Sequence, residues 1–356
     1  MKIAIVGSGN GAVTAALDMI SKGHDVRLYC RNQSIHKFDK ALERGGFDFN
    51  NEGEQSFVKF TKISDDMEYV LQDAEIIQVI IPSSFIEHYA KIMARFLKDD
   101  QLILFNMAAA MGSIRFINVL EQSHSEVMPK FAEINTLTYG TRVDYDQAVV
   151  NLSLNVRKVH YSTYDKSYLT ESFNLIKDLY PYIVKEESLW KTNLENGNPE
   201  VHPGPTLLNV GRIDYADEFA LYKEGITPHT VKLLHAVELE RLSLGRKLGF
   251  ELNTAKGARI DRGYLSEEDE EMSLNKLFNT STVFSQIKGP NEVENRYLTE
   301  DIAYGLVLWS SLGRAIGVAT PNIDAIIVIA STILERDFFE EGLTVEELGL
   351  DKLGLE

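Results

Sequence analysis

A histidine followed closely by two prolines is the first feature of this chain that suggests chemistry. The stretch His202-Pro203-Gly204-Pro205-Thr206-Leu207-Leu208-Asn209 lies just past the middle of the 356 residues. Histidine suits proton transfer because its ordinary pKa lies near neutrality, and the prolines stiffen the backbone beside it. Because a histidine is more often structural or exposed than catalytic, His202 is a candidate whose role depends on what it meets in space.

A second candidate group lies much later, in the stretch Asn295-Arg296-Tyr297-Leu298-Thr299-Glu300-Asp301. Thr299 is expected to cap a helix whose inner face carries Ile302, Leu306, Trp309 and Ile316. Asp301 would then occupy the first turn, where the helix dipole favours an ionised acid, and local stabilisation is its simpler role. In the catalytic alternative Asp301 orients His202, and Arg296 holds a substrate carboxylate through two hydrogen bonds.

The amino-terminal residues predict a site for a dinucleotide. Residues 2–6 are typical of a buried strand, and Gly7-Ser8-Gly9-Asn10-Gly11-Ala12 leads from them into a helix and a second strand over residues 24–29. In such a unit Gly7 allows the tight turn, Gly9 lets a pyrophosphate approach the backbone, and Ala12 allows close packing of the helix on the strand. The helix N-terminus would offer N–H groups to the phosphates. A tight turn in another α/β fold is the alternative.

The end of the second strand bears on the choice of cofactor. A carboxylate there would bind the ribose of NAD, whereas this chain has Cys30-Arg31-Asn32, and Asp25 lies at the start of the strand. Arg31 can pair with the 2′-phosphate of NADP through its guanidinium group. We therefore expect NADP(H), and NAD stays open if Arg31 is only a solvated surface charge.

The α/β alternation continues, with buried strands expected over residues 76–81 and 101–105. Pro82 and Ser83 follow the first of these strands, and residues 106–112 follow the second. Ligands of open parallel sheets lie over the carboxyl ends of the strands, so both segments are candidates for the floor beneath the nicotinamide ribose. Ordinary strand-to-helix loops are the equally weighted alternative.

The chain predicts an α/β dinucleotide-binding domain of the Rossmann type over residues 1–186 and an all-α domain over residues 187–356. Short strand-like pieces such as residues 148–154 would complete the sheet of the first domain. In the second, Thr227-Pro228 and Thr320-Pro321 indicate helix starts, and Thr344 with Glu347 indicates a capping box. The substrate is expected in the cleft between the two domains.

Composition limits the partners that this chain can have. The net charge of −17 disfavours nucleic acid and anionic membranes, and no apolar run is long enough to span a bilayer. The single cysteine, Cys30, cannot form an internal disulfide, which fits a reducing compartment. We expect a cytoplasmic protein that binds small molecules and holds no metal, with a homodimer left open.

Together these motifs resemble those of the octopine/nopaline, or opine, dehydrogenase family, and in particular the bacterial N-(1-D-carboxyethyl)-L-norvaline dehydrogenase type. The resemblance covers nearly the whole chain. It rests on the glycine turn, on residues 198–209, on Tyr222-Lys223-Glu224-Gly225-Ile226-Thr227-Pro228, on residues 296–301 and on Thr320-Pro321-Asn322-Ile323-Asp324-Ala325. The histidine-proline and arginine-to-aspartate motifs are together more specific than the glycine turn.

The resemblance implies an enzyme that condenses the amino group of an amino acid with a 2-oxo acid, often pyruvate. The resulting imine is then reduced with NAD(P)H. By the same resemblance His202 donates and accepts the proton, and Asp301 pairs with it. Arg296 would hold the carboxylate of the 2-oxo acid, and Asn198 would face the cofactor or the substrate.

Two other classes of protein fit the same architecture. A ketopantoate-reductase-like enzyme or a 2-hydroxyacid dehydrogenase would place a catalytic lysine on the long helix after the nucleotide domain, and Lys191 is available there. A non-catalytic NADP(H)-sensing protein would keep the fold without the chemistry. The histidine-proline and arginine-to-aspartate motifs argue against the first class, and intact His202, Arg296 and Asp301 argue against the second.

Overall fold

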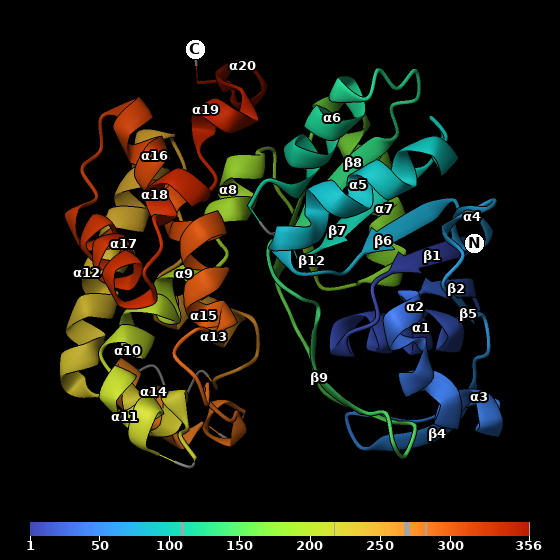
Figure 1. The fold of residues 1–356 in the computed structure, drawn as a ribbon, viewed down its shortest axis with the longest axis horizontal. Coiled ribbons are helices and arrows are strands. Elements are labelled where there is room, and N and C mark those ends of the chain that lie inside the picture. Colours follow the sequence, from blue (N-terminus) through green and yellow to red (C-terminus); the bar gives the residue numbers. More distant parts are fainter. Residues whose placement is uncertain (108–109, 217, 267–270, 282, 356) are drawn as a thin grey trace. The chain divides into compact units, whose positions relative to one another are not determined.

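The structure, a computed structural model, describes residues 1–107, 110–216, 218–266, 271–281 and 283–355. It divides into two compact units, Met1–Thr192 and Asn193–Glu356. The first unit is α/β and the second is helical, which confirms the predicted fold class (Figure 1). The predicted boundary at residue 186 falls between β12 (Ile183–Lys185) and α8 (Leu189–Leu194), and α8 itself runs across the change from one unit to the next.

An eight-stranded sheet forms the centre of the first unit, in the order β12-β11-β8-β7-β6-β1-β2-β5. Its strands are β1 (Lys2–Val6), β2 (Asp25–Tyr29), β5 (Ile63–Ser64), β6 (Ile76–Val79), β7 (Leu102–Asn106), β8 (Lys130–Ile134), β11 (Val159–Thr163) and β12. All neighbours pair in parallel except β8 and β11. The carboxyl ends of β1, β2, β6 and β7 therefore lie along one edge, as the predicted strands required.

Helices cover this sheet and bury it. One core joins β1, β6 and β7 to α4 (Met67–Leu71), α5 (Ile86–Met93) and α6 (Gly112–Gln122). Residues on the opposite sides of the same strands are also buried, which explains why the strands are continuously apolar rather than alternating. The remaining helices of the unit are α1 (Asn10–Ser21), α2 (Asn32–Ile35), α3 (Asp39–Arg44) and α7 (Leu169–Leu179).

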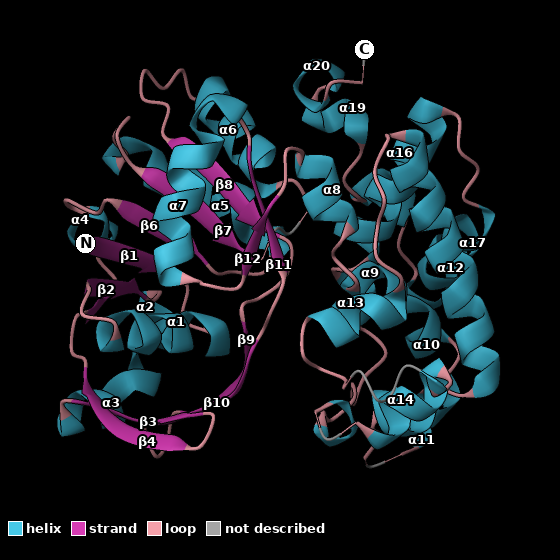
Figure 2. Ribbon diagram, turned by 180° about the vertical axis from the view of Figure 1, so that it is seen from behind, coloured by secondary structure: helices cyan, strands magenta, loops and turns pink. Residues whose placement is uncertain are grey.

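A second sheet of four strands was not predicted. It contains β4 (Glu54–Lys59), β3 (Gly46–Asn51), β10 (Val149–Asn155) and β9 (Tyr139–Asp144), in that order (Figure 2). The expectation that residues 148–154 complete the main sheet is therefore wrong. The strand β10 alternates buried Val150 and Leu152 with exposed Asn151 and Ser153, a pattern that suits a sheet with one solvated face.

The described residues of the second unit form helices and no strand. The longest are α12 (Pro228–Lys247), α16 (Val307–Ile316) and α17 (Pro321–Leu334). Shorter ones are α9 (Asn198–Val201), α10 (Pro203–Leu207), α11 (Val210–Tyr215), α13 (Ala255–Asp261), α14 (Leu274–Thr280), α15 (Arg296–Thr299), α18 (Phe338–Glu341), α19 (Val345–Leu348) and α20 (Leu350–Leu353). Across the described part of the chain, no helix combines the length and apolarity needed to cross a bilayer.

Side-chain caps start several of these helices where the sequence predicts them. The Thr227 hydroxyl accepts from the Thr230 amide at the start of α12, and Thr344 forms the predicted capping box with Glu347. The prediction for Thr299 is wrong, because Asn295 caps the helix: its side chain accepts from the Tyr297 amide. Consequently Asp301 does not lie in a capped first turn but between α15 and a π-helical turn, Ile302–Leu306, that continues into α16.

Candidate active site

The glycine turn of the first unit has the backbone geometry that a phosphate cradle needs. Gly7 has φ +134°, and a Cβ there would lie 2.2 Å from the Ile80 carbonyl oxygen, so no other residue fits. A Cβ built at Gly9, by contrast, would meet no atom of the described residues within 4 Å. Gly9 is also the N-cap of the twelve-residue helix α1, whose first backbone N–H groups have no partner within the helix. A phosphate group can approach at this point.

Neighbouring segments hold the turn in place. The Ser8 carbonyl oxygen accepts hydrogen bonds from the Lys37 ammonium at 2.5 Å and from the Tyr145 hydroxyl at 2.8 Å. The Asn10 side chain accepts from the Val143 amide at 3.1 Å. At Gly11 a Cβ would meet the Leu137 side chain at 2.7 Å, and Ala12 is fully buried, so this face of α1 packs tightly. The predicted turn residues therefore form one structural unit.

Arg31 follows the carboxyl end of β2, the position whose side chain is expected to favour either NAD or NADP. It is exposed, it precedes α2, and its guanidinium carbon lies 5.5 Å from the centre of the Phe85 ring. Within the described residues no acidic group forms an ion pair with it. A solvent-facing cation without a carboxylate partner at this edge is available to a phosphate.

The candidates for the nicotinamide floor lie at the same edge of the sheet. Pro82 and Ser83 follow β6, and the Ser83 carbonyl oxygen accepts from Arg115 at 2.8 Å. Asn106 ends β7, but its amide donates to the Thr138 hydroxyl at 3.0 Å and to the Tyr180 hydroxyl at 3.1 Å, so the side chain points into the protein. Residues 108 and 109 of the predicted segment lie outside the described residues.

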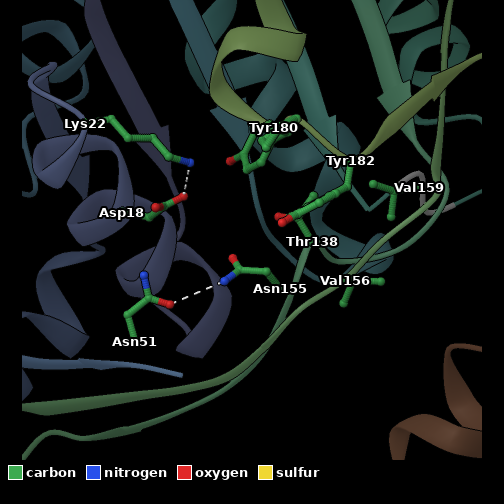
Figure 3. A pocket seen from close by; sticks show the side chains of 10 residues that line it. Asp18, Lys22, Asn51, Thr138, Asn155, Val156, Val159, Tyr180 and Tyr182 are labelled. Carbon is green, nitrogen blue, oxygen red and sulfur yellow. Dashed lines mark hydrogen bonds and ion pairs between the residues drawn. The ribbon is translucent and has the colours of Figure 1, made fainter. Parts of the chain in front are cut away.

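A cavity of about 200 Å³ in the first unit is lined by Thr138 and Tyr180, whose hydroxyls accept from Asn106, but not by the glycine turn, Pro82 or Ser83 (Figure 3). Its polar side chains bind one another: Lys22 pairs with Asp18 at 2.8 Å, and Asn155 donates to Asn51 at 3.3 Å. Tyr139 also donates to the Asp18 carboxylate, at 2.7 Å. The Tyr139–Asp18 contact ties α1 to the four-stranded sheet, so these polar residues have structural partners.

In the second unit the structure brings His202 and Asp301 together. His202 joins α9 to α10, and its Nδ1 lies 2.7 Å from Asp301 Oδ2. The His202 side chain is 10% exposed. Burial raises the pKa of Asp301 above its usual value, and the neighbouring His202 opposes that rise. A carboxylate at this place accepts a hydrogen bond from Nδ1–H and stabilises a positive charge on the ring.

Two tyrosines complete the surroundings of the imidazole. The Tyr222 hydroxyl lies 2.7 Å from His202 Nε2, and the Tyr297 ring stacks on the imidazole with ring centres 4.0 Å apart and planes 20° apart. Tyr222 belongs to a π-helical turn, Leu221–Gly225, so both hydrogen-bonding partners of His202 come from or directly precede π-helical turns. Such turns are rare and concentrate at functional sites.

Sequence reasoning quoted Tyr222 within a motif but gave it no role. The only signal in the sequence was its position at the start of the segment that leads to the Thr227-Pro228 helix cap. Nothing in periodicity connects Tyr222 to His202, because the contact is made through the fold.

Arg296 and Asn198 do not contact the imidazole through their side chains in any hydrogen bond between described residues. The exposed guanidinium of Arg296 forms an ion pair with Glu300, one turn along the same short helix. Asn198 accepts the His202 backbone N–H through its own carbonyl oxygen at 3.0 Å. Asn198 lies four residues before His202 in the sequence, and Arg296 belongs to the motif that contains Asp301. Their contacts with a substrate stay predictions.

Lys191, the candidate for a catalytic lysine in a rival class, is engaged elsewhere. It lies on the short helix α8, and its ammonium pairs with the Glu186 carboxylate at 2.9 Å. The same carboxylate bonds to His160 at 2.8 Å. These contacts give Lys191 a structural role at the end of the first unit.

Comparison with known proteins agrees with a nicotinamide-dependent dehydrogenase. Residues 2–108 match the family described as NAD-dependent glycerol-3-phosphate dehydrogenase N-terminus, and residues 185–334 match NAD/NADP octopine/nopaline dehydrogenase, alpha-helical domain. The chain is 27% identical to an opine dehydrogenase of Arthrobacter sp. (strain 1C) over 351 residues, 98% of this chain and 95% of that protein.

Solved structures share the fold over the same length. Octopine dehydrogenase in complex with NADH and agmatine has a TM-score of 0.79 at 20% identity, covering 99% of this chain and 97% of the other. The same enzyme has been solved with NADH and L-arginine and with NADH and pyruvate. NADP+-bound yersinopine dehydrogenase has a TM-score of 0.67 at 14% identity, covering 99% and 93%.

The fold and these matches point to the class of NAD(P)-dependent oxidoreductases. Over nearly its whole length, the chain is similar at low identity to opine and octopine dehydrogenases.

Proposed function

We propose that this protein is an opine dehydrogenase that condenses the amino group of an amino acid with a 2-oxo acid, pyruvate being the first candidate, and reduces the imine with NAD(P)H. The observation that carries the proposal is the His202–Asp301 pair at 2.7 Å, in a helical unit that matches the octopine/nopaline dehydrogenase model. A protein that only senses NADP(H) does not require an acid–imidazole pair, although such a pair can also be structural, as His160 with Glu186 is. The chemistry of condensation and reduction, however, needs a proton donor and acceptor.

In this proposal His202 supplies and takes up the proton, and Asp301 holds the imidazole in one tautomer. An ionised Asp301 accepts from Nδ1–H, so that Nε2 is the nitrogen that exchanges its proton. The carboxylate also stabilises the imidazolium that forms. Tyr297, stacked on the ring, restricts its rotation.

Arg296 is proposed to hold the carboxylate of the 2-oxo acid. Its exposed guanidinium already binds one carboxylate, that of Glu300, and a substrate carboxylate can replace or join it. Asn198, one helical turn before His202, is proposed to face the cofactor or the substrate with its half-buried side chain.

The cofactor supplies the hydride, and the first unit is proposed to bind it. Gly7, Ser8, Gly9, Asn10, Gly11 and Ala12 would cradle the pyrophosphate, with Pro82 and Ser83 beneath the nicotinamide ribose. We propose NADP(H) as the preferred cofactor because the exposed Arg31, at the end of β2, forms no ion pair with an acidic group of the described residues. Homologous structures contain NADH in one case and NADP+ in another, so both cofactors are used within this fold.

The experiment that tests the function is NADPH oxidation with pyruvate alone and then with pyruvate and a panel of amino acids. The panel starts with norvaline and other short aliphatic amino acids, because the motifs resemble the norvaline type. Turnover that depends on the amine supports the proposal. Turnover with pyruvate alone would identify a 2-hydroxyacid dehydrogenase instead, and tight NADPH binding without turnover on the whole panel would favour a sensing protein.

A further inference from the structure

Both ring nitrogens of His202 are engaged by protein groups. Nδ1 lies 2.7 Å from Asp301 Oδ2, and Nε2 lies 2.7 Å from the Tyr222 hydroxyl oxygen. A base that exchanges a proton directly with a substrate needs a nitrogen facing that substrate. Here the nitrogen that would do so faces a tyrosine hydroxyl instead.

The Tyr222 side chain is held firmly in this position. Its ring is packed against Phe278 and Phe284, with ring centres 5.4 and 4.9 Å away, and Asn279 donates to the Tyr222 carbonyl oxygen at 2.8 Å. The stacked Tyr297 ring covers one face of the imidazole, so neither partner swings aside without disturbing the aromatic packing. The hydrogen bond is therefore a built feature of the site.

The protonation state of Tyr222 suits a relay. Burial raises the pKa of Tyr222 well above its ordinary value, so the hydroxyl keeps its proton near neutral pH. In both protonation states Nδ1–H donates a hydrogen bond to Asp301. The neutral imidazole accepts a hydrogen bond from the Tyr222 hydroxyl at Nε2, whereas the imidazolium donates a hydrogen bond from Nε2–H to the tyrosine oxygen. In the second state the hydroxyl proton of Tyr222 is released for another acceptor.

We propose that Tyr222, rather than the imidazole itself, is the catalytic residue that exchanges the proton with the substrate, and that His202 is the proton reservoir behind it. The inference rests on the proposed opine dehydrogenase function and deepens it. Asp301, His202 and Tyr222 then form a line of three groups along which a proton moves.

In the condensation direction the atoms balance as follows. The Tyr222 O–H bond breaks as the hydroxyl oxygen of the neutral carbinolamine takes the proton, and the carbon–oxygen bond breaks to release water. At the same time the imidazolium passes its Nε2 proton to the tyrosine oxygen. The imidazolium becomes neutral, the substrate becomes an iminium ion, Tyr222 is unchanged, and no electrons are exchanged with an outside group. Because the two transfers are concerted, no tyrosinate has to form.

The test compares Tyr222→Phe with the wild-type enzyme and with Tyr264→Phe. The Tyr264 ring lies in the same aromatic cluster, 5.1 Å from Phe284, and forms no hydrogen bond with His202. Loss of Tyr222 as general acid is expected to lower kcat by roughly 10²–10⁴-fold, with NADPH affinity measured by fluorescence little changed. Tyr264→Phe should keep turnover close to wild type. If Tyr222→Phe stays within about threefold of wild type, far less than a lost acid–base group costs, the relay is overturned while the proposed function stands.

A second readout does not depend on turnover. In ¹⁵N-labelled apoprotein, Tyr222→Phe should shift the His202 Nε2 resonance, and Tyr264→Phe should leave it unchanged. The titratable and charged groups around Tyr222 are Asp301, Tyr297, Tyr264 and Arg259, and Glu300 and Arg296 lie beside Asp301; all are retained in Tyr222→Phe. An unchanged Nε2 resonance in that variant would overturn the hydrogen bond and the relay with it.

A third measurement needs no variant and keeps the test valid if Tyr222→Phe fails to fold. In mixtures of H2O and D2O, two protons moving together predict a curved dependence of kcat on deuterium content. A linear dependence would mean that one proton moves, which contradicts the relay. Absence of amine-dependent turnover in the wild-type enzyme would instead overturn the proposed function, and the relay to substrate would fall with it.

Discussion

At the residue scale, the proposed chemistry depends on a carboxylate and a phenol that are hydrogen-bonded to the two nitrogens of one imidazole. Asp301 Oδ2 is hydrogen-bonded to His202 Nδ1, and the Tyr222 hydroxyl is hydrogen-bonded to His202 Nε2, each at 2.7 Å. The burial that raises the pKa of Asp301 also strengthens its hydrogen bond to the ring, because the local dielectric constant is low. Each group thus constrains the tautomer of its neighbour.

His202→Ala should lower turnover by roughly 10²–10⁴-fold and leave NADPH affinity almost unchanged, because the variant lacks the acid–base group but keeps the cofactor unit. Steady-state kinetics and NADPH titration measure the two effects separately. His235→Ala is a matched control, since His235 also pairs with an acid, Glu238 at 2.8 Å, on α12. Turnover of His202→Ala equal to wild type would remove the imidazole from the mechanism.

Arg296→Ala should raise the KM for the 2-oxo acid by roughly tenfold or more, since a hydrogen bond to a charged group contributes about 1.5–3 kcal/mol. The KM for the amino acid should change less. Arg336→Ala, which breaks a surface ion pair with Glu341, is the control. Normal saturation with pyruvate in Arg296→Ala would refute the clamp.

Arg31→Ala should weaken NADPH binding by roughly tenfold and NADH binding little, because only NADPH carries the phosphate that the guanidinium would bind. Arg95→Ala is a suitable control: Arg95 also lies over an aromatic ring, that of Phe96 at 4.7 Å, and is exposed. Equal losses for both cofactors would contradict the preference for NADP(H).

At the scale of elements, turns and helix ends place the reactive groups. The glycine turn joins β1 to α1, and the two π-helical turns, Leu221–Gly225 and Ile302–Leu306, carry Tyr222 and follow Asp301. A π-helical turn departs from the regular spacing of an α-helix, so side chains next to it point where a continuous helix would not send them. Two of the residues proposed to carry the chemistry, Tyr222 and Asp301, therefore lie in or directly before elements that break the regular period.

Gly7→Ala and Gly9→Ala should separate the two duties of the glycine turn. Gly7→Ala forces a Cβ to 2.2 Å from the Ile80 carbonyl oxygen at positive φ, so it should lower the free energy of unfolding by about 1–3 kcal/mol or more. Gly9→Ala meets no neighbouring atom, so the fold should be kept while NADPH binding weakens by roughly tenfold or more, or about 1.4 kcal/mol.

Thermal melting and NADPH titration distinguish these two outcomes. The melting temperature of Gly9→Ala should stay close to that of the wild type, whereas that of Gly7→Ala should fall because its turn is disrupted. If Gly9→Ala binds NADPH as the wild type does, the phosphate does not lie against this backbone.

At the scale of the whole molecule, the chain forms two units with separate cores, and the groups proposed for cofactor binding and for proton transfer lie in different units. The dinucleotide turn belongs to Met1–Thr192, and the imidazole with both of its partners belongs to Asn193–Glu356. The two family models match along the same division, with the nucleotide domain on residues 2–108 and the helical domain on residues 185–334. The proposed reaction needs a hydride site from the first and a proton site from the second.

Much of the fold could be predicted from local patterns. Buried parallel strands are continuously apolar, helix caps have characteristic residues, and the glycine turn has a fixed spacing, so the α/β unit, the helix start at Thr227 and the capping box at Thr344 followed from sequence. The second sheet could not be predicted from the sequence, because its neighbouring strands β3 and β10 are far apart in the chain and pair only in the folded protein. The cap at Asn295 was missed because Asn and Thr are both favoured as N-caps, and the backbone decided between them.

The sequence by itself determined the dinucleotide turn, because that turn has a fixed short spacing, and it offered a histidine, an acid and an arginine as candidates whose roles came from a family resemblance. Only the tertiary structure decided which of these groups meet. It placed His202 against Asp301, left Arg296 on the surface beside Glu300, and added Tyr222, for which no spacing gave a role. The physical reason is that a hydrogen bond acts over about 3 Å in space, and separation along the chain carries no information about that distance once the helices have packed.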